Sequence, residues 1–323
     1  MSFEADNLID RRRLRRKLTL WRALAFLAGA VAIIALGLMS GGKSMLDAQG
    51  GHIARLTISG LITGDQPTLN AIRRVKESKA ASAVIVSINS PGGTTTGSEA
   101  IYGELRELAA AKPTVAVVTG TAASGAYVAA MGTDRIFAPQ TAIVGSIGVI
   151  IQYPNFVKTL DMLGVKVEAV RSSPLKAQPS GVEPTPPEAR AALAATVAGS
   201  YAWFRDLVAE RRNLSPNDVA DVADGRVFLG RQAVSLKLID AIGSEREAIA
   251  WLEKERGTAK GLKVIDYKRV DPNDRLGLLS LAALAAEAMG FDRLAVMIGG
   301  ARRELEVQSL DGLLAVWQPH LQN

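Results

Sequence analysis

Cysteine is absent from this sequence of 323 residues, and histidine occurs only twice, as His52 and His320. Without cysteine the protein has no disulfides, no thiolate metal ligands and no cysteine nucleophile. Two histidines are too few for a histidine-rich metal site, so we expect no metal ion. Aromatic residues are also scarce, at 5 %, but hydrophobic residues make up 48 % of the chain, which is enough for a full-sized core.

Positive charge is concentrated at the N-terminus. The net charge is +6. Residues 1–22 hold seven basic and three acidic side chains, a net charge of +4, which leaves +2 for the other 301 residues. The folded part therefore has no strong basic excess, and we expect no nucleic-acid partner.

An apolar run, ALAFLAGAVAIIALGLM, follows the basic sequence RRRLRRK. Counted from Leu18 it has 22 residues, interrupted only by Arg22, which is long enough to span a hydrocarbon core of about 30 Å. The basic flank orients such a helix with its N-terminus in the cytoplasm. A cleaved signal peptide is the alternative, but no clear A-x-A site follows Met39. We expect a basic cytoplasmic tail at 1–17, a transmembrane signal anchor at 18–40 and a linker at 41–51.

After the linker, predicted strands alternate with predicted helices, which indicates an α/β fold with a parallel sheet and right-handed crossovers. A segment with five prolines, 174–187, is predicted to be an exposed loop. In the helix predicted at 98–112, Ile101, Leu105 and Leu108 share one face. Strands are expected at 52–62, 82–90, 113–120, 142–152 and 165–170, and helices at 69–78, 98–112, 124–131, 154–164 and 187–212.

The stretch TAASGAYVAA, residues 121–130, places Ser124 between a predicted strand and a predicted helix. Activated serines of many α/β hydrolases occupy such a turn, because the helix N-terminus directs N–H groups at developing negative charge. The local sequence is not G-x-S-x-G, however, and serine is also a favoured N-cap. From this stretch alone, Ser124 is an N-cap, a nucleophile or both.

A second turn, N-S-P-G-G from Asn89 to Gly93, ends another predicted strand. Adjacent glycines there allow close approach of the backbone and can direct an N–H at an oxyanion, although an ordinary strand-to-helix turn uses the same residues. No G-K-[S/T] follows this turn and the sequence has no G-x-G-x-x-G, which argues against nucleotide binding. We expect no cofactor.

The base that would activate Ser124 is not evident from the residues. Lysine serves as a base only when its pKa, near 10.4 in water, is lowered toward neutrality, as burial in an apolar site does. Lys176 lies in VRSSPLKAQPS on the proline-rich loop, where a solvated lysine is the ordinary interpretation. The residues alone leave the choice among the lysines open.

Three segments together resemble the signal peptide peptidase A (SppA) family of membrane-anchored Ser–Lys proteases. They are S-I-N-S-P-G-G, A-A-S-G-A-Y and V-G-S-I-G-V-I, in the family's order. A fourth, GRVFLGRQAVSLKLIDAIGS at 225–244, is similar to a further family segment. The resemblance extends over roughly residues 52–255 and the anchor, and it implies the ClpP/crotonase fold: a repeated ββα spiral with a mostly parallel sheet, preceded by one transmembrane helix.

The resemblance also implies roles for individual residues. Ser124 matches the family's nucleophile and Lys176 its general base. Ser146 matches a serine that orients the amine of that lysine. The oxyanion-hole donors carried over are the backbone N–H groups of Gly92 or Gly93 and of Gly125.

For the whole chain, the resemblance implies a serine endopeptidase with a protease domain at 52–255. Residues 256–323 would serve packing or oligomer contacts. Family members degrade remnant signal peptides and assemble as rings or domes whose neighbouring subunits line the substrate grooves. We therefore expect signal peptides and other apolar peptides as substrates, and a homo-oligomer in the bacterial inner membrane. Its catalytic domain would lie on the periplasmic or extracellular side.

Three alternatives stay open. A crotonase-type acyl-CoA enzyme uses the same fold and glycine oxyanion hole, but it needs acidic catalytic residues. A non-catalytic membrane scaffold could retain the fold, although it has no need for Ser124, Lys176 and Ser146 together. A related exported protease with other protein substrates would share every motif described above.

Overall fold

A computed structural model describes residues 51–269 and 314–316, together with Lys17 and Trp21. Most of the expected tail, anchor and linker, and most of the chain after residue 269, lie outside the described residues. Among the residues that are described, no helix is both long and apolar enough to cross a membrane. The chain divides into two compact units, 1–51 and 52–323, and the elements that follow belong to the second.

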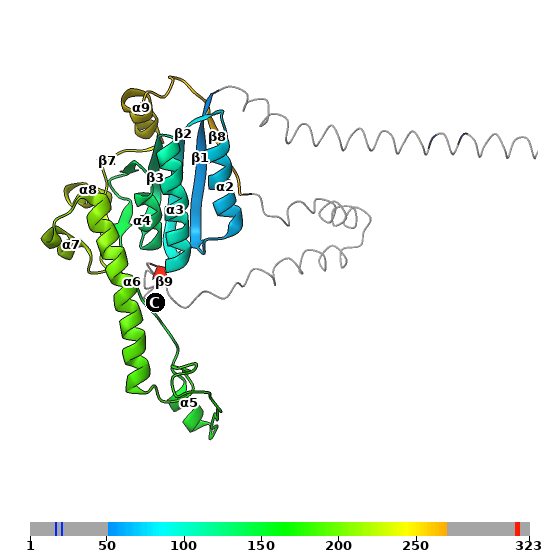
Figure 1. Cartoon of the computed structure of the whole chain (residues 1–323), viewed down its shortest axis with the longest axis vertical. Helices are drawn as coiled ribbons and strands as arrows, with labels where there is room; N and C mark the ends of the chain where they lie inside the picture. The colour runs from blue at the N-terminus through cyan, green and yellow to red at the C-terminus, as the bar shows by residue number, and fades with distance from the viewer. Residues whose placement is uncertain (1–16, 18–20, 22–50, 270–313, 317–323) are drawn as a thin grey trace, which may run out of the picture. The chain divides into compact units, whose positions relative to one another are not determined.

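Three long parallel strands form the centre of the sheet: β1 (His52–Ile62), β2 (Ala81–Thr94) and β3 (Thr114–Ala123). Figure 1 shows them side by side, with β2 between the other two. Their apolar side chains are largely buried, as expected for parallel strands that helices cover on both faces. The sequence-based prediction of these strands and of their parallel arrangement is confirmed.

Short strands extend the sheet beyond β3. β5 (Ile143–Gly145) pairs in parallel with β3 and antiparallel with β6 (Val227–Leu229). β4 (Arg135–Ala138) lies parallel to β3 and to β7 (Ala241–Ile242). Because β5 pairs with the C-terminal end of β3, it brings a second chain segment to the place where β3 stops.

Two further short strands complete the sheet. β8 (Val264–Asp266) pairs in parallel with the start of β1. β9 (Leu314–Val316) pairs antiparallel with the last residues of β2. The result is a mixed α/β architecture with a mostly parallel sheet, which fits the ClpP/crotonase fold implied by the resemblance.

Helices cover both faces of the sheet (Figure 1). The alternation of side chains along β2 separates the two cores. Val84 belongs to the larger core, which α2 (Gln66–Glu77) and α3 (Thr95–Ala111) help to form. Ile85 belongs to the smaller core beneath α9 (Glu245–Glu255). The apolar face predicted for α3 is confirmed, since all three of its expected core residues are buried.

The nucleophile candidate Ser124 precedes α4 (Gly125–Met131), which is buried along its whole length. The long helix α6 (Pro187–Arg212) has the bounds that the sequence predicts, and its C-terminal half joins the larger core. α7 (Pro216–Val222) and α8 (Gly230–Ser235) follow it. α4 packs against α3, α6 and strands β1 to β4, so the turn at Ser124 leads into a fully buried helix.

Between β5 and α6 the chain forms an arm, residues 154–186, whose one helix is α5 (Val157–Met162). The two ends of the arm meet where the N–H of Phe156 donates to the carbonyl of Gly181, at 2.7 Å. Figure 1 shows α5 within the arm, away from the sheet. The proline-rich part of the arm is neither helix nor strand, as predicted.

Two strand predictions are wrong in this region. Residues 165–170 form no strand, because their valines are exposed and no neighbouring strand among the described residues offers them a partner. The strand predicted at 142–152 is reduced to β5, because Ser146 has a φ of 51° and turns the chain out of the sheet. An apolar, β-branched sequence alone does not make a strand.

Candidate active site

Ser124 occupies a strained turn between β3 and α4. Its φ of 53° and ψ of −120° lie in a region that residues with a side chain rarely adopt. Its N–H donates to the carbonyl of Gly145 at 2.7 Å, and the residue is only 1 % exposed. Strain of this kind persists where surrounding structure imposes it and is typical of functional sites. The turn therefore resembles the strained strand-to-helix turn of serine hydrolases.

Ser124 occupies the N-cap position of α4, as predicted, but its side chain does not cap the helix. Its side chain accepts no hydrogen bond from the first turn of α4. Its hydroxyl lies instead 3.5 Å from the carbonyl oxygen of Gly148, which is a marginal contact. In the first turn of α4, the N–H of Tyr127 donates to the carbonyl of Ser124 at 2.9 Å, whereas the N–H of Gly125, the first residue of the helix, has no acceptor within the helix.

Ser146 lies beside Ser124. Ala123 pairs with Gly145 across β3 and β5, and the two serines are the residues that follow this pair. Paired strands are about 4.8 Å apart, so the serine backbones begin as neighbours. Ser146 also has a positive φ, of 51°, its N–H donates to the carbonyl of Arg226 at 2.8 Å, and it is 8 % exposed.

The glycine turn at the end of β2 reaches the same place, because Ser90 pairs with Ala122, two residues before Ser124. Gly92 has a φ of 107°, and its N–H donates to the hydroxyl oxygen of Ser90 at 3.1 Å. A Cβ atom on Gly93 would lie 1.8 Å from the carbonyl oxygen of Ile62, so only glycine fits there.

The edge of the glycine turn opposite β1 carries β9. Gly92 pairs with Val316, Gly93 with Ala315, and β9 runs antiparallel to β2. The role predicted for the C-terminal segment, 256–323, is packing or oligomer contacts. Its described part contributes a strand next to the candidate site, which shows that this backbone edge accepts an extended chain.

Lys176 is not joined to these residues. It is exposed, at the end of a turn in which its N–H donates to the carbonyl of Ser173 at 3.1 Å. Within residues 51–269 its side chain makes no hydrogen bond or ion pair with Ser124 or Ser146. The described chain thus brings together two serines and the two glycine-containing turns, and leaves the expected base on the arm.

Histidine does not supply the base within the described chain. His52 begins β1, whereas Ser124 follows the end of the parallel strand β3, so the two lie at opposite edges of the sheet. The His52 side chain is buried, and its Nε2 lies 3.0 Å from the hydroxyl of Tyr267. Among the described residues, no three histidine, aspartate or glutamate side chains gather to hold a metal ion.

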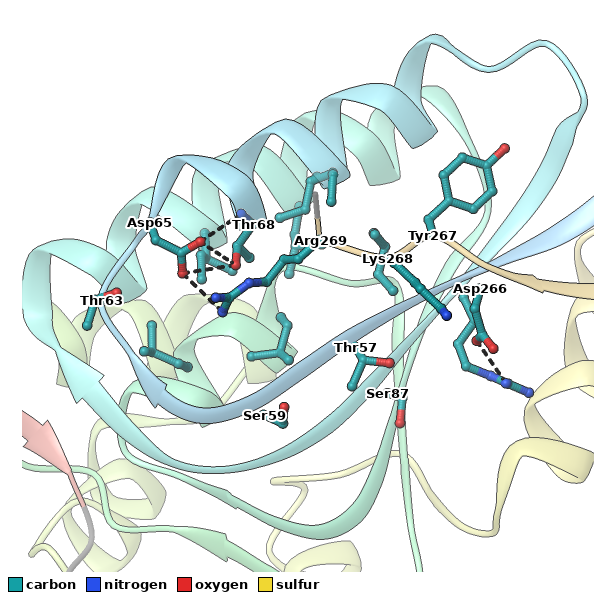
Figure 2. Close-up of a pocket in the computed structure, with 18 of the residues that line it drawn as sticks. Thr57, Ser59, Thr63, Asp65, Thr68, Ser87, Asp266, Tyr267, Lys268 and Arg269 are labelled. Carbon is teal, nitrogen blue, oxygen red and sulfur yellow. Dashed lines mark hydrogen bonds and ion pairs between the residues drawn. The ribbon is translucent and has the colours of Figure 1, made fainter. Parts of the chain in front are cut away.

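A cavity of about 640 Å³ lies elsewhere, between β1 and α2. Figure 2 shows Asp65 there, in contact with Thr68 and Arg269, and Thr57 and Ser59 from β1. The residues that line it include none of the expected catalytic residues. The cavity is therefore separate from the candidate active site.

Comparisons with known proteins identify the family of this chain. Residues 106–259 match the model of Peptidase family S49. A Synechocystis protein named "Putative protease slr0021" is 38 % identical over 201 residues, which cover 62 % of this chain and 72 % of that protein. The "Putative signal peptide peptidase SppA" of Enterococcus faecium is 34 % identical over 242 residues, 71 % of this chain and 69 % of that protein. The chain belongs to peptidase family S49.

A third relative of this S49 peptidase is "Serine protease SPPA, chloroplastic" of Arabidopsis thaliana. It is 32 % identical over 250 residues, which cover 76 % of this chain but 37 % of that protein. These names and the family identify the chain as a serine-type peptidase of the SppA family. The family match includes Ser124, Ser146 and Lys176, and it begins after the glycine turn.

The sequence does not predict the contacts that stabilise the C-terminal end of α4 in this S49 peptidase. The guanidinium of Arg211 donates to the carbonyls of Met131 at 3.0 Å and Thr133 at 3.1 Å, and Arg106 donates to that of Gly132 at 3.2 Å. Burial, and secondarily the nearby Arg106, lowers the pKa of Arg211. Cations at a helix C-terminus satisfy its last carbonyls. The two arginines come from α3 and α6, so no local pattern could have linked them to Ser124.

Proposed function

We propose that this chain is a membrane-anchored serine endopeptidase in which Ser124 is the nucleophile and Lys176 the general base. The observation that carries the proposal is the backbone conformation of Ser124, which costs about 1–3 kcal/mol. An N-cap serine needs no such conformation, and Ser124 makes no cap hydrogen bond. A nucleophile turn accounts for both facts, since it must present a hydroxyl beside unoccupied N–H groups.

In the proposed reaction, the neutral amine of Lys176 accepts the proton of the Ser124 hydroxyl as Oγ attacks the peptide carbonyl carbon. The N–H groups of Gly93 and Gly125 hold the oxyanion, and such donors lower the barrier by about 3–4 kcal/mol each. The Lys176 ammonium then protonates the departing amine, which leaves an ester on Ser124. Water hydrolyses this ester with the same lysine as base, and Ser146 orients the amine.

We infer further that Lys176 acts on Ser124 of a neighbouring copy in a homo-oligomer. Lys176 is exposed on the arm, and the arm also exposes large apolar side chains, such as Met162 at 80 % and Leu163 at 71 %. Exposed apolar patches are typical of association surfaces. A lysine base needs surroundings that favour the neutral amine, which a covering copy would supply. Head-to-tail contacts of this kind close into rings, so neighbouring copies would share the substrate grooves.

Apolar peptides are the proposed substrates, and remnant signal peptides the specific class. An extended peptide that replaces β9 at the edge of Gly92 and Gly93 would pair with backbone N–H and C=O groups and lie beside Ser124. The name of the Enterococcus faecium relative supports the signal-peptide class. The apolar run at 18–40 would hold the enzyme at the membrane where such peptides reside, with the N-terminus in the cytoplasm and the catalytic unit outside.

The test is cleavage of a synthetic signal peptide by the full-length chain in mild detergent. Labelling by a fluorophosphonate probe is measured in parallel. Wild-type protein is expected to cleave the peptide and take up the probe, and Ser124→Ala is expected to do neither. Lys176→Ala is expected to lose cleavage while Lys166→Ala, a change of another exposed lysine on the arm, keeps it.

Two outcomes would contradict the proposal. Cleavage by Ser124→Ala at the wild-type rate would exclude this serine as the nucleophile. Equal activities of Lys176→Ala and Lys166→Ala would exclude Lys176 as the base. A crotonase-type acyl-CoA enzyme would differ again, because its activity would need no probe-reactive serine.

A further inference from the structure

Ser90, the second residue of the N-S-P-G-G turn, is a buried serine that the proposed reaction does not use. The residue is 1 % exposed. Its hydroxyl donates to the carbonyl of Gly60 at 2.6 Å and accepts from the N–H of Gly92 at 3.1 Å. The hydroxyl is therefore satisfied as both donor and acceptor, and it joins β1 to the glycine turn.

The sheet is irregular where Ser90 makes these contacts. The β1–β2 pairing shifts register between Ser59 and Leu61, and the β2–β3 pairing shifts between Ile88 and Ser90. Gly60, inside the first shift, has a φ of 69°. Regular ladder hydrogen bonds are interrupted at such bulges, so the backbone there depends on other partners. The Ser90 hydroxyl is one such partner, and it contacts both irregular segments.

These contacts hold both ends of Gly92, and the longer one, to its carbonyl oxygen, reaches the peptide unit between Gly92 and Gly93. The Ser90 hydroxyl lies 3.1 Å from the nitrogen of Gly92 and 3.4 Å from its carbonyl oxygen. A trans peptide directs its N–H opposite to its C=O. With the Gly92 carbonyl turned toward Ser90, the N–H of Gly93 points away from it.

We propose that Ser90 is a positioning residue, whose hydroxyl holds the Gly92–Gly93 peptide so that the N–H of Gly93 is presented to the oxyanion formed at Ser124. The inference rests on the proposed function of Ser124. It also identifies Gly93, rather than Gly92, as the oxyanion donor of this turn, because the N–H of Gly92 already donates to Ser90. Without the hydroxyl, glycine freedom at Gly92, whose φ is 107°, lets the peptide rotate.

Ser90→Ala tests the inference in the full-length chain, with Thr114→Val as a matched control. Thr114 is equally buried, its hydroxyl donates to the carbonyl of Lys112 at 2.9 Å, and it begins β3, at the opposite end of that strand from Ser124. Both changes remove a buried hydroxyl, so both are expected to lower the melting temperature.

Only Ser90→Ala is expected to impair the chemical step. Loss of an oxyanion donor lowers kcat by about 100–1,000-fold, and a donor that is only misplaced should cost less, about 10–100-fold, with KM within about threefold. The rate of fluorophosphonate labelling should fall in step, and the pH profile should keep its shape, since no titrating group is changed. Ser90→Thr, which keeps the hydroxyl, should recover most of kcat.

A kcat of Ser90→Ala no lower than that of Thr114→Val would overturn the inference, since the hydroxyl would then serve stability alone. If Ser90→Ala does not fold, Ser90→Cys decides, because its thiol is a weak donor; a wild-type kcat in this variant would contradict the inference. If Ser124→Ala cleaves as fast as wild type, it is the proposed function that fails, and the positioning role falls with it.

Discussion

The N–H of Ser124 donates a hydrogen bond of 2.7 Å to the carbonyl of Gly145, the residue immediately before Ser146. This bond ties the nucleophile turn to the turn that carries the second serine. Both serines have a φ near +50°. Because strained backbone persists only where neighbouring structure imposes it, the two turns stabilise each other's conformation.

Ser124→Gly is expected to stabilise the protein while it abolishes catalysis. Glycine adopts the φ and ψ of this position without a side-chain clash, so relief of strain should exceed its greater loss of entropy by about 1 kcal/mol. Ser124→Ala removes the hydroxyl and keeps the clash, so its free energy of unfolding should stay near that of wild type. Denaturant unfolding of the three proteins measures the difference. A glycine variant less stable than the alanine variant would contradict strain at this turn.

Gly93→Ala is expected to disrupt the glycine turn, because its Cβ atom would meet the Ile62 carbonyl oxygen at 1.8 Å. Separation of β1 from β2 should lower the free energy of unfolding by about 3 kcal/mol and abolish peptide cleavage. Gly103→Ala is the control. It lies on the exposed face of α3, a Cβ atom there meets nothing within 4 Å, and the change should stabilise the helix by about 1 kcal/mol. If Gly103→Ala lowered the free energy of unfolding as much as Gly93→Ala, the close approach of Gly93 to the Ile62 carbonyl would be refuted.

The N-terminal end of α9 should become less stable at acid pH. Glu247 accepts hydrogen bonds from the N–H and hydroxyl of Ser244, and these lower the pKa of its carboxyl from 4.5 to about 2, with a smaller contribution from Arg246. A depressed pKa means that the carboxylate stabilises the fold above pH 4.5 and that this stabilisation is lost as pH falls toward about 2.

Glu247→Gln, which cannot ionise, measures this effect. Near neutral pH the variant should melt at a lower temperature than wild type, and the gap should close as pH falls to about 2. A gap that does not change with pH would show that the charge of Glu247 does not stabilise α9. Glu255→Gln, near the other end of the helix, is the control for a general effect of lost charge.

The sequence predicts the centre of this fold well because its signals are local. β1 and α6 have their predicted bounds, since each is marked by its own apolar pattern and by adjacent glycine or proline. Residues 165–170 show the limit. Their valines favour a strand, but a strand exists only with a partner, and the sequence does not say which segment would supply one.

The candidate site, too, can be predicted only in part from the sequence. The motifs mark Ser124, Ser146 and the glycine turn, and register pairing of β2, β3 and β5 brings these residues together. The contacts of Ser90 with Gly60, and of Arg211 with the end of α4, join segments 30 and about 80 positions apart. The periodicity of apolar residues does not predict such contacts, because they depend on how the strands and helices pack together.

Mixing two inactive variants tests the proposal that neighbouring copies share the Ser–Lys pair. Ser124→Ala keeps Lys176, and Lys176→Ala keeps Ser124. If each site takes its serine from one copy and its lysine from the next, co-expression should restore activity. With random mixing in equal amounts, about one quarter of the sites would be intact, so about a quarter of wild-type activity is expected.

A pair contained within one copy gives the opposite result, because every copy in the mixture then lacks one member. Peptide cleavage would stay at the level of the separate variants. A mixture of Ser124→Ala with Lys166→Ala calibrates the assay, since Lys166→Ala copies carry both residues. Under the shared arrangement a site is intact whenever its serine comes from a Lys166→Ala copy, which predicts about half of wild-type activity, twice that of the first mixture.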